Sequence, residues 1–490
     1  MRTPFLLAAA LLALGSSAHA QRQRRAPAIS TAPLSAIAAE VSQERLRATV
    51  ERLVSFGTRH TASSRDNPTR GIGAARTWAE RELQSFSRAC GGCLDVARVS
   101  DGVTNVRLPQ MTLVEDVIAI QRGTERPNQV VIITGHIDSR VSDVMDTTSD
   151  APGANDDGSG TAAVIEAARV LSRHRFPATI IYAALSGEEQ GLVGGRILAQ
   201  WITTQGYEVI ANLNNDIIGN SCSSDGVCDD ANVRIFSEGL RWQGGDQIRA
   251  EVRRLGGEND SPSRNLSRYL ATLAGNLSLG LDVRQIWRND RFGRGGDHSE
   301  FLNAGFPAVR FSVAVENYDA QHQNLRTENG RVYGDTIDRM DFPYLRRVTA
   351  LNVAALAALA RAPMPPAPTV EGAVSTDTRL RWEAVTGASS YIVRWRRTDA
   401  SQWQHSLRSA DVNSFDCGTS GATIVRDRND RLVSFECSWS LPGIRVDDWV
   451  FGVSSVAADG TESPVASAVP GGAFRPYVAP PPQPARPAGQ

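Results

Sequence analysis

Lysine is absent from this chain of 490 residues, and all 52 basic residues are arginines. This absence excludes any mechanism that depends on a catalytic lysine. Charge of one sign is not in excess either, because the formal net charge is −1. No electrostatic argument therefore favours nucleic acid or an anionic membrane surface as a partner.

Long apolar runs are absent after the N-terminus, so we expect no transmembrane helix. One short apolar run, Phe5 to Leu14, follows Arg2 and precedes the small-residue site Ala18-His19-Ala20. This order is typical of a signal peptide over residues 1–20, cleaved after Ala20, although a buried N-terminal helix is the alternative. We expect a secreted or periplasmic protein in which residues 21–34, polar and proline-bearing, form a flexible segment.

Cysteine is sparse, with six residues in the chain. They fall in three close pairs: Cys90 with Cys93, Cys222 with Cys228, and Cys417 with Cys437. An even count in an exported chain favours disulfides. The first pair, in a Cys-Gly-Gly-Cys sequence, could alternatively be a redox or metal half-site, but no second such motif completes a zinc knuckle. We therefore predict three local disulfides.

Apolar runs of strand length lie between about residues 115 and 320. They are Val130 to Asp138, Thr179 to Glu189, Val209 to Asp216, and Phe306 to Ala314. Nearly continuous Val, Ile, Leu and Ala suit strands that are buried on both faces of a sheet. Helical patterns separate or flank these runs at about residues 35–54, 159–174, 191–205 and 344–361. The alternation predicts an α/β fold with a largely parallel central sheet flanked by helices.

The residue pattern of the sequence changes after the last helical segment. Residues 362–368 are proline-rich and predict a stiff linker. Alternating strand patterns follow over residues 369–475, and Trp382, Tyr391 and Trp395 suit the core of a small all-β sandwich. This stretch resembles a fibronectin type III module. The proline-rich residues 476–490 predict a disordered tail.

Histidine and carboxylate residues cluster where the predicted strands end. The residues concerned are His136, Asp138, Asp156, Glu188, Glu189, Asp216 and His322. In a parallel sheet these positions meet at the carboxyl edge, where α/β proteins build their sites. Charged residues at the ends of buried strands are costly unless they are paired or bound to metal. Convergence of so many such residues predicts a metal site.

The residue types favour zinc in a two-metal arrangement. Imidazole and carboxylate bind zinc well, and the absence of thiolates leaves the metal Lewis-acidic, with room for water. A carboxylate shared by two ions about 3.5–4 Å apart allows them to clamp a bridging water and to polarise a carbonyl. Of the adjacent Glu188 and Glu189, one can bind metal while the other takes the proton of the water.

Several motifs occur in a fixed order along the chain. They are GHIDS (135–139), APGANDDGSG (151–160), SGEEQGL (186–192), NNDIIG (214–219) and GDHSEFLNAGFPA (296–308), and LVSFGTRHT (53–61) precedes them. Together they resemble the co-catalytic dizinc aminopeptidase family, which includes secreted bacterial leucine aminopeptidases. The resemblance covers roughly residues 40–360 and implies a dizinc peptidase domain over residues 35–361 that acts on peptides.

The resemblance also implies a role for each site residue. His136 and Asp216 would bind one zinc ion, Glu189 and His322 the other, and Asp156 would bridge the two; Glu188 would be the general acid/base, and Asp138 would fix the tautomer of His136 by a hydrogen bond. One departure concerns the oxyanion, since Gly293 stands near the place where some members carry a stabilising tyrosine.

Three residues near these motifs each allow two interpretations. Asp157 suits a cap for the helix that starts near Ser159 better than a metal ligand. His298 could line the substrate pocket, although a structural histidine is as consistent with its context. Arg294 could meet a substrate carboxylate, and the alternative is an ordinary surface arginine.

Other functions share much of this ligand set. A glutaminyl cyclase has the same fold and works with one zinc ion, and a carboxypeptidase would differ only in its pocket. A non-catalytic, metal-stabilised binding protein is the third alternative, but it would not need Glu188. The C-terminal module either docks the enzyme to a surface or polymer or acts as a structural cap.

Overall fold

The computed structural model describes residues 31–412, 415, 417, 425–426, 432–433 and 436–478. The predicted signal peptide, residues 21–30 of the predicted flexible segment, and residues 479–490 of the predicted tail lie outside these ranges. Within the described residues, no helix is both long and apolar enough to cross a membrane.

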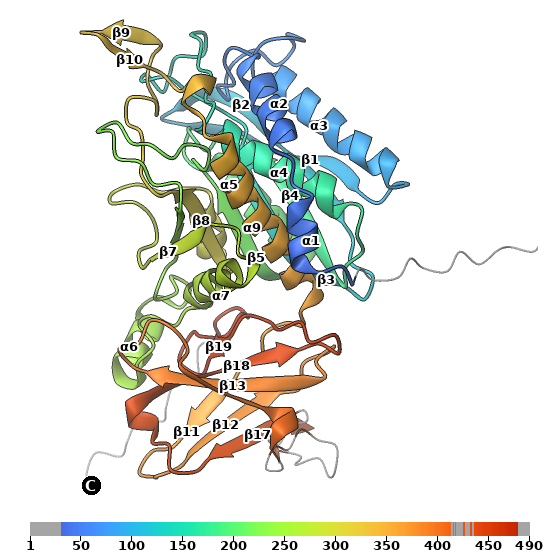
Figure 1. Ribbon diagram of the computed structural model, residues 1–490, viewed down its shortest axis with the longest axis vertical. Coiled ribbons are helices and arrows are strands. Elements are labelled where there is room, and N and C mark those ends of the chain that lie inside the picture. Colours follow the sequence, from blue (N-terminus) through green and yellow to red (C-terminus); the bar gives the residue numbers. More distant parts are fainter. Residues whose placement is uncertain are drawn as a thin grey trace, which may run out of the picture.

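An eight-stranded sheet forms the centre of the larger part of the molecule (Figure 1). Its spatial order is β1 (Asp95–Asn105), β2 (Leu108–Gln121), β4 (Ala178–Leu185), β3 (Arg126–His136), β5 (Glu208–Asn215), β8 (Ala308–Val313), β6 (Asn232–Phe236) and β7 (Asp282–Ile286). The four inner strands β4, β3, β5 and β8 are mutually parallel. They correspond to the four predicted apolar runs, so the predicted α/β fold with a largely parallel sheet is confirmed.

Helices cover both faces of the sheet. They are α1 (Leu34–Ala39), α2 (Gln43–Val54), α3 (Ile72–Ala89), α4 (Gly158–Leu171), α5 (Val193–Gln205), α7 (Pro262–Leu277), α8 (His298–Asn303) and α9 (Phe342–Arg361). A further helix, α6 (Gly245–Leu255), lies beside the C-terminal part instead (Figure 1). Side chains of β3 alternate between two cores. Val131 and Ile133 join the core formed with α1, α2, α3, α4, α7 and α9, whereas Val130 and Ile132 join the core formed with α5 and α8. This double burial explains why apolar residues fill β4 and the middle of β3.

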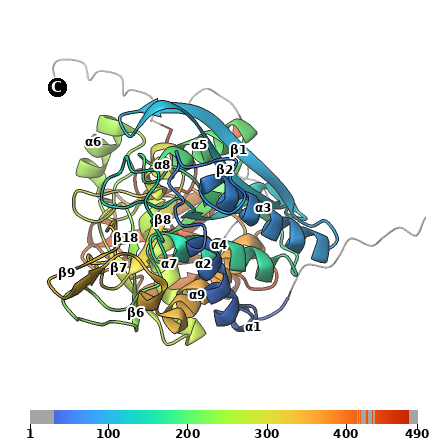
Figure 2. The same cartoon turned by 90° about the horizontal axis from the view of Figure 1, so that it is seen from above.

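Two features at the edges differ from the sequence prediction. The long strands β1 and β2 are antiparallel to each other, and they arch along one side of the molecule in the view from above (Figure 2). The predicted helix over residues 35–54 is two helices. Ser42 accepts a hydrogen bond from the main-chain N–H of Arg45 at 3.3 Å, so it caps α2 and separates it from α1.

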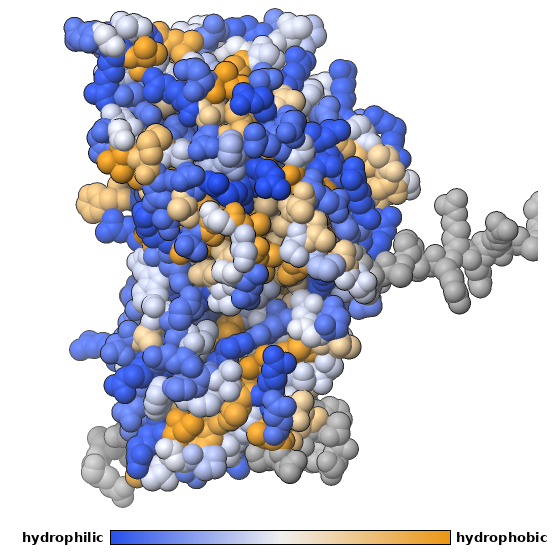
Figure 3. All heavy atoms as spheres, in the orientation of Figure 1, coloured by the Kyte–Doolittle hydropathy of each residue, from blue (hydrophilic) through white to orange (hydrophobic). Residues whose placement is uncertain are grey.

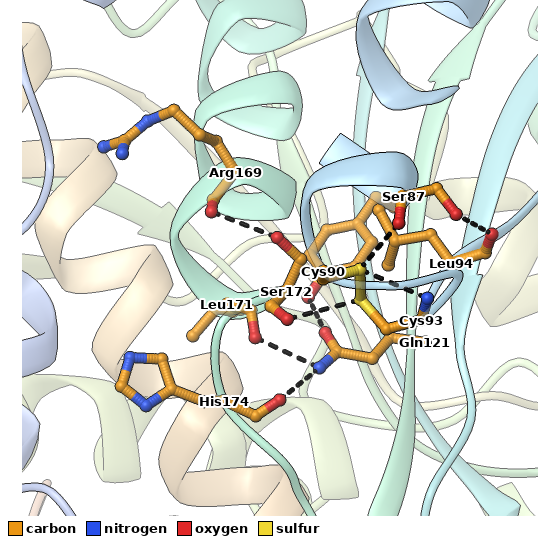
Figure 4. Close-up of a disulfide and its surroundings, with 10 residues drawn as sticks. Ser87, Cys90, Cys93, Leu94, Gln121, Arg169, Leu171, Ser172 and His174 are labelled. Atoms are coloured by element: carbon orange, nitrogen blue, oxygen red, sulfur yellow. Dashed lines mark hydrogen bonds between the residues drawn. A yellow bond between two sulfur atoms is a disulfide. The ribbon is translucent and has the colours of Figure 1, made fainter. Parts of the chain in front are cut away.

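All three predicted disulfides are present, and they pair Cys90 with Cys93, Cys222 with Cys228, and Cys417 with Cys437. The first follows the last turn of α3 and lies against the end of α4, where the Sγ of Cys93 is 3.3 Å from the carbonyl oxygen of Ser172 (Figure 4). No cysteine of the described chain is free. The Cys90–Cys93 pair is therefore neither a zinc half-site nor a free dithiol here.

The C-terminal part consists mainly of two antiparallel sheets. One contains β11 (Thr369–Glu371), β12 (Thr378–Glu383) and β17 (Glu436–Leu441); the other contains β14 (His405–Arg408), β13 (Ser390–Arg397), β18 (Trp449–Val456) and β19 (Ala466–Ser467). Two further strands, β15 (Val425–Arg426) and β16 (Leu432–Val433), pair with each other. Trp382, Tyr391 and Trp439 meet in a core shared by the two larger sheets, and the partly buried Trp395 packs against it. This packing of two sheets confirms the predicted small all-β sandwich.

A buried ionic contact joins the sandwich to the α/β part. The guanidinium of Arg396 contacts both carboxylate oxygens of Asp260 at 2.7 Å, and both side chains are 2% exposed. Ser467 donates to the same carboxylate at 2.9 Å. The space-filling view shows the two parts in continuous contact across a narrower junction (Figure 3).

The sandwich lies at the amino edge of the parallel strands. Arg126, at the start of β3, donates to the carbonyl oxygens of Arg361 and Ala362, where α9 leads into the sandwich. The hairpin of β9 (Arg326–Glu328) and β10 (Arg331–Tyr333) projects at the opposite end of the molecule (Figure 1). The carboxyl edge of the sheet therefore faces away from the sandwich.

Candidate metal centre and active site

The predicted ligands converge at the carboxyl edge of the sheet. Candidate ligand atoms form two groups, each with all atoms within 4.8 Å of one another: His136, Glu188 and Asp216 in the first, and Asp156, Glu189 and His322 in the second. Each residue sits at the end of an inner strand or in the loop that follows one. Residues up to 186 positions apart in the sequence are thus brought together by the parallel order of the strands.

Asp156 lies between the two groups. Its Oδ1 is 3.2 Å from the Nε2 of His136, and its Oδ2 is 3.0 Å from the Nε2 of His322. The His136 Nε2 also faces Asp216 Oδ1 at 3.9 Å, and the His322 Nε2 faces Glu189 Oε1 at 3.1 Å. A carboxylate with one oxygen on each side has the arrangement that a bridging ligand needs.

The donor set fits zinc. Oε1 of Glu189 is buried and lies 3.1 Å from the Nε2 of His322, but it accepts no well-aligned hydrogen bond in the described part of the chain. A buried oxygen without such a bond is costly. The converging atoms are imidazole nitrogens and carboxylate oxygens, which are ordinary zinc donors. The residues therefore suit a divalent metal bound by nitrogen and oxygen.

Asp138 orients three neighbours at once. Its carbonyl oxygen is 3.1 Å from the Nδ1 of His136, a contact that requires the proton on Nδ1 and leaves Nε2 free to bind metal. Its carboxylate is farther from the ring, at 3.5 Å, and instead accepts the main-chain N–H groups of Glu188 at 3.3 Å and Glu189 at 3.2 Å. Asp138 therefore holds the imidazole by its main chain and both glutamates by its side chain.

Glu188 belongs to the first group and also lines the cleft above it. Desolvation raises the pKa of its carboxyl to about 8, and the attraction of His136 opposes that rise. Its neighbour Glu189 is buried and makes an ion pair with Arg140 at 2.9 Å. The two adjacent glutamates thus have different environments, as a division into base and ligand requires.

Asp157 joins the ends of three segments and is fully buried. Its carboxylate accepts the main-chain N–H groups of Gly160 at 2.8 Å, His136 at 2.9 Å and Ile217 at 3.2 Å. The bond to Gly160 caps α4, so the predicted helix cap is confirmed. The other two bonds hold the loops that carry His136 and Asp216.

Two site residues were absent from the sequence prediction. Arg310, buried in the middle of β8, contacts Asp216 Oδ1 at 2.8 Å and Asp290 Oδ2 at 3.1 Å. Asp335 accepts the main-chain N–H of Asp156 at 2.7 Å. An arginine inside an apolar strand was a readable signal, because an unpaired buried charge is costly. Asp335 had no comparable signal, since it lies in a loop far along the chain.

A cleft of about 670 Å³ opens over the two groups. Arg294 lines this cleft and pairs with Glu316 at 2.9 Å. Gly293 lines it as well, at the position where the related motif can carry a tyrosine. His298 is fully buried, faces the carbonyl oxygen of Asn289 at 3.0 Å, and is not among the residues that line the cleft.

Comparison with known proteins identifies the family. The model of peptidase family M28 matches residues 116–357. A probable zinc metalloprotease of Leptosphaeria maculans is 43% identical over 444 residues, which cover 89% of this chain and 97% of that protein. A probable zinc metalloprotease of Pyrenophora teres f. teres is 42% identical over 439 residues, which cover 88% of this chain and 86% of that protein. The chain belongs to peptidase family M28.

Solved structures with similar folds are more distant in sequence. The LapB protein of Legionella pneumophila aligns with a TM-score of 0.49 and 20% identity over 67% of this chain and 75% of that one. A glutaminyl cyclase of Porphyromonas gingivalis aligns with a TM-score of 0.44 and 17% identity over 64% of this chain and 98% of that one.

Proposed function

We propose that this chain is an exported dizinc aminopeptidase that removes N-terminal residues from peptides. One observation carries the proposal, namely that the two oxygens of Asp156 face the Nε2 atoms of His136 and His322. A site for one ion would not require a carboxylate between two imidazoles. Zinc is favoured by the nitrogen and oxygen donor set and by the names of the similar fungal proteins.

Five residues would hold the two ions. His136 and Asp216 would bind the first, Glu189 and His322 the second, and Asp156 both. Zinc bound there would supply Lewis acidity toward the scissile carbonyl and lower the pKa of a water molecule.

Glu188 would move the proton. Its carboxylate would accept a proton from the attacking water and deliver it to the nitrogen of the leaving amine. Asp138 supports this step because it holds the main-chain N–H groups of both glutamates. Substrate would enter by the cleft, which Arg294 lines.

Zinc titration with matched peptides tests the proposal. The chelated protein should regain activity as zinc is added, up to two ions per chain, and should cleave peptides with a free N-terminus but not N-acetylated ones. Saturation at one ion, with cyclisation of N-terminal glutamine, would instead identify a glutaminyl cyclase. Cleavage of N-blocked peptides that stops when the C-terminus is amidated would identify a carboxypeptidase.

Export is proposed on separate grounds. The first 20 residues have the order of a signal peptide, and all described cysteines are in disulfides, which persist in oxidising compartments. N-terminal sequencing of the secreted protein should begin at Gln21. We further propose that the sandwich, which resembles a fibronectin type III module, docks to a surface or polymer.

A further inference from the structure

Arginines are as numerous as carboxylates in the lining of the cleft. Four of them line it, namely Arg107, Arg140, Arg291 and Arg294. Apolar lining is sparse, because Leu192 and Tyr318 are its only large apolar or aromatic side chains among the described residues. A cleft of this composition is poorly suited to an apolar side chain and well suited to an anionic group.

Two of the four arginines already have carboxylate partners outside the cleft lining. Arg291 and Arg294 contact Glu316 at 3.5 Å and 2.9 Å, and Arg291 also contacts Asp290 at 3.0 Å. Both guanidinium groups are therefore already engaged with carboxylates of the protein. The other pair differs in this respect.

Arg107 is exposed and projects from the turn between β1 and β2. Its Nη1 donates to the carbonyl oxygen of Glu189 at 2.8 Å, which fixes the side chain over the cleft. Within the described ranges, no carboxylate lies within 4.0 Å of its guanidinium. Its remaining N–H groups can therefore serve a ligand.

Arg140 lies on the other side of the same glutamate. Its Nε contacts Glu189 Oε2 at 2.9 Å, and its Nη2 is 2.7 Å from the Nδ1 of His322. Arginine only donates, so the second contact requires a lone pair on Nδ1. A neutral His322 that binds zinc through Nε2 carries its proton on Nδ1, and the contact is then lost. Zinc binding would thus release the Nη2 of Arg140 toward the cleft.

The formal charges of the cleft lining also favour an anionic ligand. The carboxylates that line the cleft are Asp156, Glu188, Glu189 and Asp216. Two zinc ions carry four positive charges, which offset these four carboxylates. Arg107 then has no acidic partner within the described ranges, and Arg140 keeps only its contact with Glu189, whose charge the zinc ions would offset.

We propose, on the basis of the dizinc function above, that Arg107 and Arg140 bind a carboxylate of the peptide substrate. Arginine pairs with carboxylates through two parallel hydrogen bonds, which fixes orientation as well as affinity. The carboxylate has two sources in a short peptide: an acidic side chain beside the scissile bond, or the free C-terminus of a dipeptide. The enzyme is thus specific for anionic short peptides.

Two pairs of substrates test the proposal and distinguish the sources. Glutamyl anilide is compared with glutaminyl anilide for the side chain, and leucyl-alanine with leucyl-alanine amide for the C-terminus. The zinc-loaded wild type should prefer the carboxylate member of at least one pair by about 10-fold or more in kcat/KM, mainly through KM. In Arg107→Gln and Arg140→Gln this ratio should fall toward one.

Controls separate a specific effect from a structural one. Arg122→Gln removes an exposed arginine, paired with Asp95, from outside the cleft and should leave the ratio at its wild-type value. Zinc content is measured in every variant, because Arg140 touches the ligand Glu189. Calorimetric binding of the same peptides to zinc-loaded Glu188→Gln gives a readout that does not depend on turnover, and the additional Arg107→Gln change should weaken binding of the carboxylate peptides.

The outcomes distinguish this inference from the proposed function. A zinc enzyme that cleaves the amide with no preference in either pair keeps the aminopeptidase function and overturns the carboxylate site. A preference that persists in both arginine variants overturns it too. Binding of carboxylate peptides through Arg107 without any hydrolysis would keep the carboxylate site and overturn the peptidase function.

Discussion

The carboxylate of Asp335 accepts a hydrogen bond from the main-chain N–H of Asp156 at 2.7 Å. The same carboxylate accepts the N–H of Asn155. These bonds tie the loop that carries the proposed bridging ligand to a segment almost 180 residues away. Asp335 itself is not within either group of ligand atoms. It therefore acts on the site by holding the main chain of Asp156.

Asp335→Ala should weaken metal binding without removing a ligand. Loss of the main-chain acceptor lets the 155–156 loop move, and residues that support ligands are commonly worth about 10–100-fold in metal affinity. Competition with a chelator measures the affinity. Asp338→Ala, an exposed change three residues away, is the matched control. Equal zinc affinity in both variants would contradict the role assigned to Asp335.

The adjacent glutamates should respond differently to substitution. Glu188→Gln should keep both zinc ions and lose activity by about 10²–10⁴-fold or more, because the proton acceptor is removed. Glu189→Gln should instead reduce zinc content, since a neutral amide is a poorer zinc ligand. Elemental analysis alongside turnover of an amino-acid anilide measures both effects. Metal loss in Glu188→Gln alone would show that the two roles are exchanged.

Arg310→Met should destabilise the fold strongly. The substitution leaves Asp216 without its buried arginine partner and Asp290 with Arg291 as its remaining arginine partner, and such a loss typically costs about 3–5 kcal/mol. Urea unfolding measures the difference. Arg122→Met, which removes an exposed pair with Asp95, should cost less than about 1 kcal/mol. Zinc should restore part of the loss, because the metal balances Asp216 but not Asp290.

Asp116→Asn should change how stability depends on pH. Burial raises the pKa of Asp116 to about 8, whereas a carboxyl in the unfolded chain ionises near pH 4. Between those values the native state holds one proton more than the unfolded state, so stability falls as pH rises, by roughly 1.4 kcal/mol per pH unit at most.

The variant lacks this proton and should gain stability relative to the wild type as pH rises from 5 to 8. Its amide oxygen can still accept the main-chain N–H of Ser186, which Asp116 accepts at 2.9 Å. Thermal unfolding at several pH values measures the difference. A difference between the two proteins that is the same at pH 5 and pH 8 would show that Asp116 is ionised throughout.

The inner strands, and the convergence of candidate metal ligands at their ends, could be predicted because each strand has its own local sequence pattern. Each inner strand contains a largely apolar run, and His136 and Asp216 stand at the end of such a run or directly after it. The parallel order then brings the ends together without further information. Burial on both faces of the sheet thus leaves an apolar composition that can be recognised from residue types alone.

The features that could not be predicted from the sequence depend on contacts between distant segments. Strand β1 is largely exposed and polar, so it has no apolar run that predicts it, and it is held in place by pairing with β2. Asp335 contributes a carboxylate from a loop, where a solvated surface residue is the ordinary expectation. The cleft arginines Arg107 and Arg140 come from separate segments, and nothing in either segment indicates that they share Glu189 as a neighbour.

The attachment of the sandwich at the amino edge of the sheet has a consequence for any docking role. If the sandwich adheres to a surface or polymer, the hydrolytic cleft points away from that surface or polymer. The anchored enzyme would then process peptides that arrive by diffusion rather than the material that holds it. The buried Arg396–Asp260 contact favours this orientation, so the module would support the enzyme on the surface without presenting that surface to the cleft.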